Sequence, residues 1–349
     1  MNRIPTDIYN ILSDRKARSQ VACDSRVRAI YALHQDLEHL DRSIRTAKAN
    51  KMIVILDGGD LLAEDAKIQE LERQRDIYLN IHHISIDYDQ PIPFCDICED
   101  EGWMISDHPD VTEAHIENGL KRIPLNRFST DPETGKTLCK CVRDLLVPLY
   151  LEQSGLDHYP GISYSAFTDK YFSEKEKIAQ IYDFARYVVS VQRVPNMLFW
   201  GEPGTGKTFM AICVLRELIE SGFSGYVVRA PEMMDIMDEY RTIKRTFSPN
   251  AQRDKMITGL RDKILLSDFL VIDELGVEPV GLNNTADLLQ IIGERLINER
   301  VTIITTNLDL KALASRYDGR LYSRLVGNFY KFQFPGRDIR LEKKRIDGI

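Results

Sequence analysis

A glycine-rich loop constrains the fold of this chain more than any other segment of it. The loop, GEPGTGKT at residues 201–208, fits the pattern G-x-x-x-x-G-K-[ST] in full and lies between the apolar segment VPNMLFW and the helical segment TFMAICVLRELIES. In that setting, glycines let successive backbone N–H groups converge on phosphate oxygens, and the following helix adds its positive N-terminal end. Motif and setting together disfavour a chance glycine turn. The loop therefore predicts a nucleotide-phosphate site made by Gly201, Glu202, Pro203, Gly204, Thr205, Gly206, Lys207 and Thr208.

Short apolar segments alternate with helical patterns beyond about residue 166. GYVVRA at 225–230, FLVID at 269–273 and VTIITT at 301–306 are further strand candidates. Continuous apolar strands separated by amphipathic helices are typical of a parallel sheet that is covered by helices on both faces. We therefore predict the α/β fold class, with a P-loop nucleotide-binding core.

Polar residues follow two of the predicted strands. Asp273 ends the strand FLVID, at the edge where ligands bind in open α/β sheets, and we expect it to hold Mg²⁺ through water together with the Thr208 hydroxyl. Lys207 would neutralise the β and γ phosphates of ATP, and Glu274 would act as general base on the attacking water. Asn307 could orient that water, although asparagine is also a common turn residue. Surface acids that close a strand are the alternative for Asp273 and Glu274.

Four of the six cysteines cluster by spacing in an aperiodic segment. They form CDIC and CKC pairs, namely Cys95, Cys98, Cys139 and Cys141. Four thiolates could hold one Zn²⁺ in a tetrahedral, structural site, although C-x-C is a tighter and less common spacing than C-x-x-C. His108 or His115 could replace one cysteine. Redox-active or ordinary cysteines are the alternatives, but no thioredoxin-like βαβ pattern surrounds CDIC.

The N-terminal region has helical patterns. In residues 22–46 a 3-4-3-4 spacing of apolar residues forms the narrow stripe of a coiled-coil seam, and a second helical run at 64–79 follows Gly58–Gly59. A helical hairpin results, whose apolar face either meets a partner or packs on the chain itself. The predicted organisation is a helical hairpin at 1–90, a zinc-binding module at 91–145, a linker at 146–165 and an ATPase domain at 166–349.

The charge balance limits the partners. With a formal net charge of −7, the chain is unsuited to coating nucleic acid through bulk positive charge, though a local basic strip is compatible with that charge. Arg241, Lys244 and Arg245 form one such strip, and residues 316–349 another; a solvated charged face is the alternative for each. There is no apolar run of about 18 residues and no secretory signal at the N-terminus, so we expect no membrane span and a cytoplasmic location.

The motifs together resemble those of AAA+ ATPases, and among them the DnaC/DnaI-type helicase loaders and the related IstB-type transposition helpers. The segments that carry the resemblance are NMLFWGEPGTGKT, VVRAPEMMD, FLVIDELG, TIITTNL, GRLYSRLVG and FPGRDIR, together with the N-terminal C-x-x-C-x-D-x-G. The resemblance implies that Asn307 is the first sensor and Arg324 the arginine finger. Arg320, four residues away on the same helical face, is its companion. It also implies that Arg340 is the second-sensor arginine and that little or no C-terminal lid follows.

The resemblance implies a protein that loads a replicative helicase hexamer onto single-stranded DNA and grips the helicase through its N-terminal region. Its subunits would associate side by side, with ATP at their interfaces. An IstB-like ATP-dependent DNA-binding helper of transposition is the alternative, and a nucleotide-gated adaptor is a third hypothesis. The helical hairpin and zinc module favour the loader, because the transposition helper usually has a shorter N-terminal region. Glu274 disfavours the adaptor.

Overall fold

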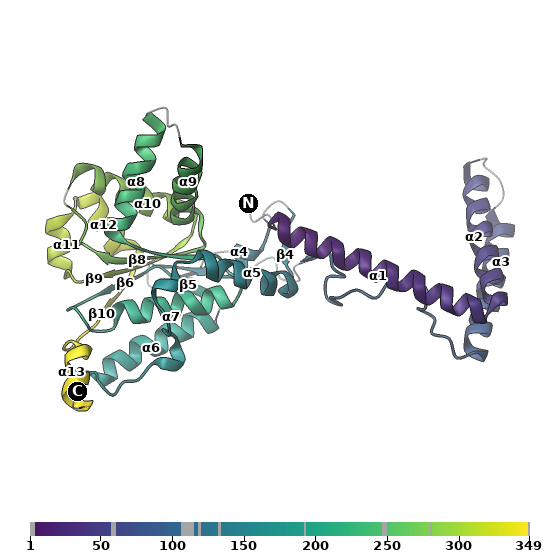
Figure 1. Cartoon of the computed structure of the whole chain (residues 1–349), viewed down its shortest axis with the longest axis horizontal. Coiled ribbons are helices and arrows are strands. Elements are labelled where there is room, and N and C mark those ends of the chain that lie inside the picture. The colour runs from purple at the N-terminus through teal and green to yellow at the C-terminus, as the bar shows by residue number, and fades with distance from the viewer. Residues whose placement is uncertain are drawn as a thin grey trace. The chain divides into compact units, whose positions relative to one another are not determined.

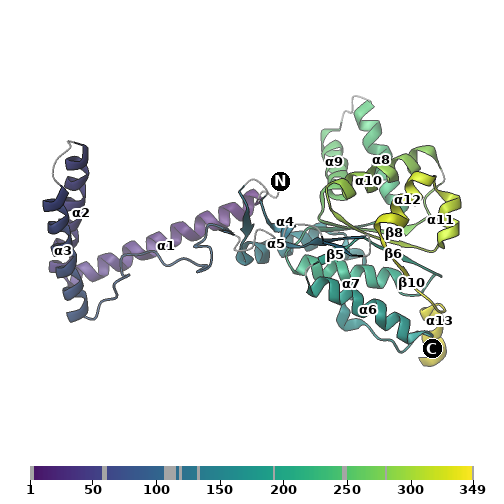
Figure 2. The same cartoon turned by 180° about the vertical axis from the view of Figure 1, so that it is seen from behind.

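The computed structural model describes residues 4–56, 61–105, 115–117, 120–131, 134–191, 193–245, 250–279 and 281–347. These residues divide into two compact units, Ile4–Gly102 and Trp103–Ile349. Figures 1 and 2 show the elements of both units from opposite sides. The N-terminal unit contains helices α1 (Thr6–Leu33), α2 (Gln35–Leu56) and α3 (Leu61–Ile81). Among the described residues, none of the helices combines the length and the apolar character that crossing a bilayer requires.

The helix predicted across residues 22–46 is interrupted, so the prediction of one continuous seam is wrong. The chain turns at His34, where φ is −134° and ψ is 69°, and α2 begins at the next residue. Leu33 on one side of the turn is 83% exposed, whereas Leu37 on the other side is fully buried against Leu79 and Tyr88. The break allows Leu37 to pack against residues far along the chain, which a straight stripe on one helix would not reach.

Helices α2 and α3 form the predicted hairpin, and it packs on itself. Ala47 in α2 and Ile68 in α3 are buried, and Lys48 forms an ion pair with Glu72 at 2.7 Å. The tip of the hairpin, in contrast, exposes the large apolar side chains of Met52, Ile53, Ile55, Leu61 and Leu62. Part of the apolar stripe therefore serves the hairpin itself, and its tip presents apolar side chains that another molecule can contact.

The C-terminal unit is built on a five-stranded parallel sheet, as predicted. Its strand order is β10-β6-β9-β8-β7, and every neighbouring pair is parallel. The strands are β6 (Met197–Trp200), β7 (Gly225–Arg229), β8 (Phe269–Leu275), β9 (Val301–Thr306) and β10 (Tyr330–Gln333). The four predicted strands are confirmed. The edge strand β10 is an addition, since its half-exposed, alternating sequence carries a weaker signal than the buried strands.

Helices cover both faces of this sheet, with successive strand residues facing opposite layers. Phe199 packs in the cluster that includes α6 and α7, whereas the adjacent Leu198 packs with α8, α10 and α12 (Figure 1). The helices of the C-terminal unit from residue 175 onward are α6 (Lys175–Ser190), α7 (Lys207–Glu220), α8 (Ala230–Arg245), α9 (Ala251–Leu266), α10 (Leu282–Ile297), α11 (Leu310–Arg316), α12 (Gly319–Asn328) and α13 (Ile339–Asp347). This three-layer arrangement is the predicted α/β fold class.

The segment before the sandwich contains short elements. A two-stranded sheet pairs β1 (Trp103–Ile105) with β4 (Lys136–Leu138), and a second small sheet contains β2 (His115–Glu117), β3 (Leu120–Pro124) and β5 (Arg193–Pro195). Helices α4 (Asn126–Ser129) and α5 (Lys140–Gln153) and two 3-10 turns (Leu156–His158, Tyr164–Ala166) complete it. Within the predicted linker, Leu156 is buried in the core and the Val227 N–H donates to the Ser154 carbonyl at 2.8 Å. Residues 154–156 are thus part of the packed sandwich.

A fully buried arginine joins the elements at the amino end of β8. The Arg295 guanidinium, on α10, donates to the carbonyls of Ile264 (3.0 Å), Ser267 (2.9 Å) and Val301 (2.7 Å) and to the Thr302 hydroxyl (2.9 Å). Burial lowers its pKa to about 9, and the arginine stays charged at neutral pH. Because these carbonyls end α9 and begin β9, one side chain fixes where a helix stops and a strand starts.

Arg295→Met should lower the free energy of unfolding by about 3 kcal/mol, because it leaves several buried carbonyls without a donor. Scanning calorimetry of the whole chain would show this as a drop of several degrees in the transition of the C-terminal unit. Arg253→Met is the control, since Arg253 is a solvent-exposed arginine on α9 that pairs with Glu239, and it should leave the transition unchanged. Equal transitions for the two variants would contradict the role given to Arg295.

Candidate functional site

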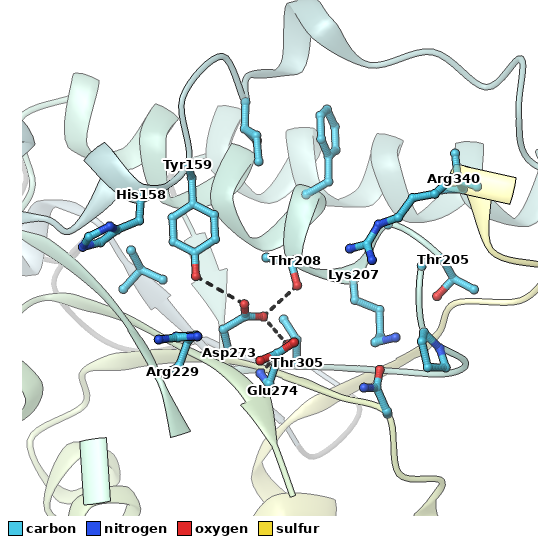
Figure 3. A pocket seen from close by; sticks show the side chains of 18 of the residues that line it. His158, Tyr159, Thr205, Lys207, Thr208, Arg229, Asp273, Glu274, Thr305 and Arg340 are labelled. Atoms are coloured by element: carbon cyan, nitrogen blue, oxygen red, sulfur yellow. Dashed lines mark hydrogen bonds between the residues drawn. The ribbon is translucent and has the colours of Figure 1, made fainter. Parts of the chain in front are cut away.

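A cavity of about 880 Å³ lies at the carboxyl ends of the parallel strands (Figure 3). Its walls come from the glycine-rich loop, the start of α7, the ends of β7, β8 and β9, and the start of α13. The lining includes most of the predicted site residues, namely Pro203, Gly204, Thr205, Gly206, Lys207, Thr208, Asp273, Glu274, Asn307 and Arg340. Its size is that of a pocket for a small ligand.

The glycine-rich loop holds Lys207 close to its own backbone. Gly206 has a φ of 90°, a left-handed conformation that side chains disfavour, and it turns the chain directly into α7. Lys207 is buried, and its Nζ donates to the carbonyls of Gly201 at 2.8 Å and Glu202 at 2.7 Å. Burial lowers the pKa of Lys207 to about 8, although nearby carboxylates oppose this shift. A poorly solvated ammonium at the start of a helix is suited to binding a phosphate anion.

Asp273 is the centre of the hydrogen bonds in the cavity. Its Oδ1 accepts from the hydroxyls of Thr208 (2.7 Å) and Thr305 (2.6 Å), and its Oδ2 accepts from the Tyr159 hydroxyl (3.3 Å; Figure 3). Burial, together with the Asp273 carboxylate, raises the pKa of Tyr159, so its hydroxyl remains a donor. A carboxylate beside a threonine hydroxyl at the end of a phosphate loop is the oxygen donor set that Mg²⁺ prefers. These residues therefore fit the predicted metal.

Glu274 reaches the cavity because the strand bends at this point. Its φ is 59°, which is unusual for a residue with a side chain, and the register between β8 and β9 shifts between Ile272 and Leu275. The Glu274 N–H donates to the Thr305 hydroxyl at 3.0 Å. Asp273 and Glu274 would point to opposite faces of a regular strand, but here both line the same cavity. Such backbone strain is often found at functional sites.

Several residues of the cavity wall were not predicted from the sequence, among them three polar residues close to Asp273. Arg229 ends β7 and is the register partner of Asp273 on β8. Thr305 on β9 and Tyr159 in the predicted linker both bond to Asp273. Polar residues at the ends of adjacent parallel strands are a usable signal for Arg229 and Thr305, because those ends meet at one edge. Tyr159 has no motif, and only its place in the fold reveals it.

The C-terminal segment brings Arg340 to the cavity by docking on the glycine-rich loop. The Ile339 N–H donates to the Gly204 carbonyl at 2.9 Å. Gly204 has a φ of 73°, which side chains disfavour, and a Cβ there would lie 2.1 Å from the Asp338 carboxyl group, so a side chain would displace that group. Arg340, the predicted second-sensor arginine, therefore lines the same cavity as the phosphate loop.

Arg320 and Arg324 lie on α12, away from the cavity of their own chain. Arg320 is exposed and is 3.4 Å from Asp318, whereas the Arg324 Nη1 donates to the Leu289 carbonyl of α10 at 2.7 Å. Neither is among the described residues that line the cavity. Of the basic strip on α8, Arg241 already pairs with Asp238 and Asp287. Lys244 lies over the Tyr240 ring, and α8 ends at Arg245.

The profile of the family described as IstB-like ATP binding protein matches residues 166–344. The chain belongs to this family. The replicative helicase loader DnaC of Escherichia coli (strain K12) is 26% identical over 136 residues, which cover 39% of this chain and 52% of the relative. A protein named as the ATP-binding protein of an insertion sequence in Geobacillus stearothermophilus is 26% identical over 161 residues, covering 45% of this chain and 59% of the relative.

A crystal structure of the DnaC helicase loader is 23% identical, with a TM-score of 0.38, over 51% of this chain and 99% of that chain. The chain spans about half the length of the DnaC of Escherichia coli that it matches. The family match and the curated relatives confirm the resemblance to DnaC-type AAA+ proteins and establish an ATP-binding family.

This IstB-family chain also brings its four clustered cysteines together. The sulfur atoms of Cys95, Cys98, Cys139 and Cys141 all lie within 4.8 Å of one another. The CDIC turn is shaped by Asp100, whose carboxylate accepts from the N–H groups of Phe94 (2.8 Å) and Cys95 (3.1 Å). Four thiol groups this close fit one tetrahedral Zn²⁺. His108 lies outside the described residues, and of His115 only its place in β2 is described.

Metal analysis of the purified protein should find about one zinc per chain, because four thiolates can complete a tetrahedral shell. Cys98→Ser should lower the zinc content well below one, since it removes a buried ligand. Cys23→Ala is the matched control: Cys23 is also buried, but it lies on α1 and is not part of the cluster, so this variant should keep its zinc. Wild-type protein with little zinc would rule out the site.

Proposed function

We propose that this chain is an ATPase that loads a replicative helicase hexamer onto single-stranded DNA. The observation that carries the proposal is the cavity at the glycine-rich loop, where Lys207, Thr208, Asp273 and Glu274 converge in a protein of an ATP-binding family. The name of the DnaC relatives supports the coupling of this ATP site to a helicase. Residues 166–349 would be the ATPase domain, preceded by the linker, the zinc-binding module and the helicase-binding hairpin.

ATP hydrolysis at this cavity follows from the chemistry of the lining residues. The loop N–H groups and Lys207 bind the β and γ phosphates, and Arg340 adds positive charge from the C-terminal segment. Thr208 and, through water, Asp273 would hold Mg²⁺, which would supply positive charge to neutralise the phosphates. Glu274 takes the proton of the attacking water, and Asn307 orients that water. Glu274 is exposed, which suits a base that contacts water, whereas Asp273 is buried and bonded to hydroxyl groups, which suits a metal-binding residue.

The arginine that completes the site is supplied by a neighbouring subunit. Within its own chain Arg324 donates to the Leu289 carbonyl and does not line the cavity, which supports a role outside that cavity. Arg320, exposed one helical turn earlier, supports the contact. A guanidinium provided in trans stabilises charge on the transferred phosphoryl group. ATP turnover therefore depends on self-association, and an isolated chain is a poor ATPase.

Arg324→Ala should bind ATP normally but hydrolyse it about a thousandfold more slowly, because the transition-state charge is no longer stabilised. Lys207→Ala should fail to bind ATP. A mixture of the two variants should recover part of the activity, since Lys207 of one subunit and Arg324 of its neighbour form an intact site. Phosphate release from the mixture is compared with that of each variant alone at the same total concentration. Absence of any recovery would contradict the shared site.

The N-terminal unit is the helicase-binding part of the proposal. The hairpin tip, Met52 to Leu62, carries five exposed large apolar side chains among its described residues, a feature typical of protein-contact surfaces. Part of the hairpin below the tip packs on itself, with Ala47 of α2 and Ile68 of α3 buried. Single-stranded DNA would contact basic residues of the C-terminal unit, for which Lys244 and Arg245 at the end of α8 are candidates.

A helper of transposition is the second candidate function. It is favoured by the family description and by the insertion-sequence relative from Geobacillus stearothermophilus. Such a protein would bind duplex DNA as an ATP-dependent assembly and would not need a helicase. The two functions differ in partner, so one binding experiment separates them.

The full chain with ATP and Mg²⁺ should retain a purified replicative helicase hexamer on affinity beads. The double variant Met52→Gln, Ile53→Gln should lose most of the helicase, because it makes the apolar tip polar. Val21→Gln is the matched control, since Val21 is comparably exposed but lies on α1. Equal retention by all three proteins would remove the tip from the contact. No retention by wild type, together with tight duplex DNA binding, would favour the transposition helper.

A further inference from the structure

A short segment that precedes α6 borders the cavity and is fixed at both ends. We call residues 154–162 the arch segment. At its start, the Ser154 carbonyl accepts from Val227 of β7 at 2.8 Å and Leu156 is buried in the core. At its end, the Ile162 carbonyl accepts from the Arg216 Nε of α7 at 2.7 Å. Between these two attachments, His158 and Tyr159 line the cavity (Figure 3).

Tyr159 contacts the proposed metal-binding carboxylate through a different oxygen from the one that the two threonine hydroxyls contact. Its hydroxyl donates to Oδ2 of Asp273 at 3.3 Å, whereas Thr208 and Thr305 both donate to Oδ1. Of these three hydroxyl donors, Tyr159 alone belongs to neither the loop helix α7 nor the sheet. The arch segment is therefore connected directly to the centre of the site.

The plane of an aspartate carboxylate is set by its surroundings, because rotation about the Cβ–Cγ bond meets only a broad, soft barrier. Two donors on one oxygen hold that oxygen but leave the other free to swing. A donor on each oxygen fixes the plane. The Tyr159 hydroxyl supplies the donor on the second oxygen, which a group that only fills space would not do. The attachments of the arch segment hold that hydroxyl in place.

We propose that Tyr159 is a positioning residue for Mg²⁺: its hydroxyl fixes the carboxylate of Asp273 and thereby sets the affinity of the site for Mg²⁺–nucleotide. This inference rests on the proposed nucleotide function. Because the Tyr159 hydroxyl is proposed to orient the metal-binding carboxylate of Asp273, its removal should change how nucleotide binding depends on Mg²⁺. The aromatic ring has a separate part, as a wall of the cavity.

Tyr159→Phe removes the hydroxyl and keeps the ring, so the arch segment should fold as before. Binding of a fluorescent ATP analogue to the full chain is titrated with Mg²⁺ and is also measured in EDTA. The variant should need about tenfold more Mg²⁺ for half-maximal binding, the effect of one hydrogen bond to a charged acceptor, and should match wild type in EDTA. Tyr164→Phe is the matched control, because the buried Tyr164 hydroxyl has no hydrogen-bond partner in the described part of the chain.

The outcomes separate this inference from the function on which it rests. Wild-type protein that does not bind the nucleotide contradicts the proposed function itself. Wild-type protein that binds with the help of Mg²⁺, while Tyr159→Phe shows the same Mg²⁺ dependence, overturns only the role of Tyr159. Equal weakening with Mg²⁺ and in EDTA overturns it as well, because the hydroxyl would then contact the nucleotide and not the metal site.

Discussion

The carboxylate of Asp273 is the point on which the architecture of the candidate site depends. It is buried at the end of β8 and accepts hydroxyl hydrogen bonds from α7, β9 and the arch segment. A buried carboxylate without such donors would carry a large desolvation cost. The carboxylate that would bind Mg²⁺ therefore also connects the helix after the glycine-rich loop, the sheet and the arch segment to one another. Stability and function coincide at this residue.

Local sequence patterns were sufficient for the parts of the site that come from continuous segments. The glycine-rich loop, Asp273 and Asn307 each follow directly from a short motif next to a strand, and the parallel sheet brings their chain segments to one edge. The alternating strands and helices likewise predicted the α/β sandwich. Such features depend on residues within one or two elements, which is why the sequence alone reveals them.

Features that depend on which distant segments become neighbours follow only partly from the sequence. Arg229 joins the cavity only because β7 is the neighbour of β8 in register, and Tyr159 only because the arch segment is attached to β7 and α7. The turn at His34 likewise accompanies a distant contact, because Leu37 in the first turn of α2 packs on Leu79 near the end of α3. In each case a tertiary contact overrides or completes a local pattern, and periodicity carries no information about it.

The polar groups at the two ends of β8 have different roles: those at the amino end stabilise the fold, and those at the carboxyl end form the candidate site. At the amino end, Asp268 accepts from Ser224 and Arg300, and Arg295 is surrounded by carbonyl acceptors, so every strong donor has a fixed place. At the carboxyl end, the Asp273 carboxylate accepts from hydroxyl groups within the described part of the chain, and Glu274, whose φ is 59°, lines the same cavity. Strained backbone conformations persist only where the surrounding structure determines them, and a strand anchored at its amino end by Arg295 and paired with β7 and β9 provides such surroundings for Glu274.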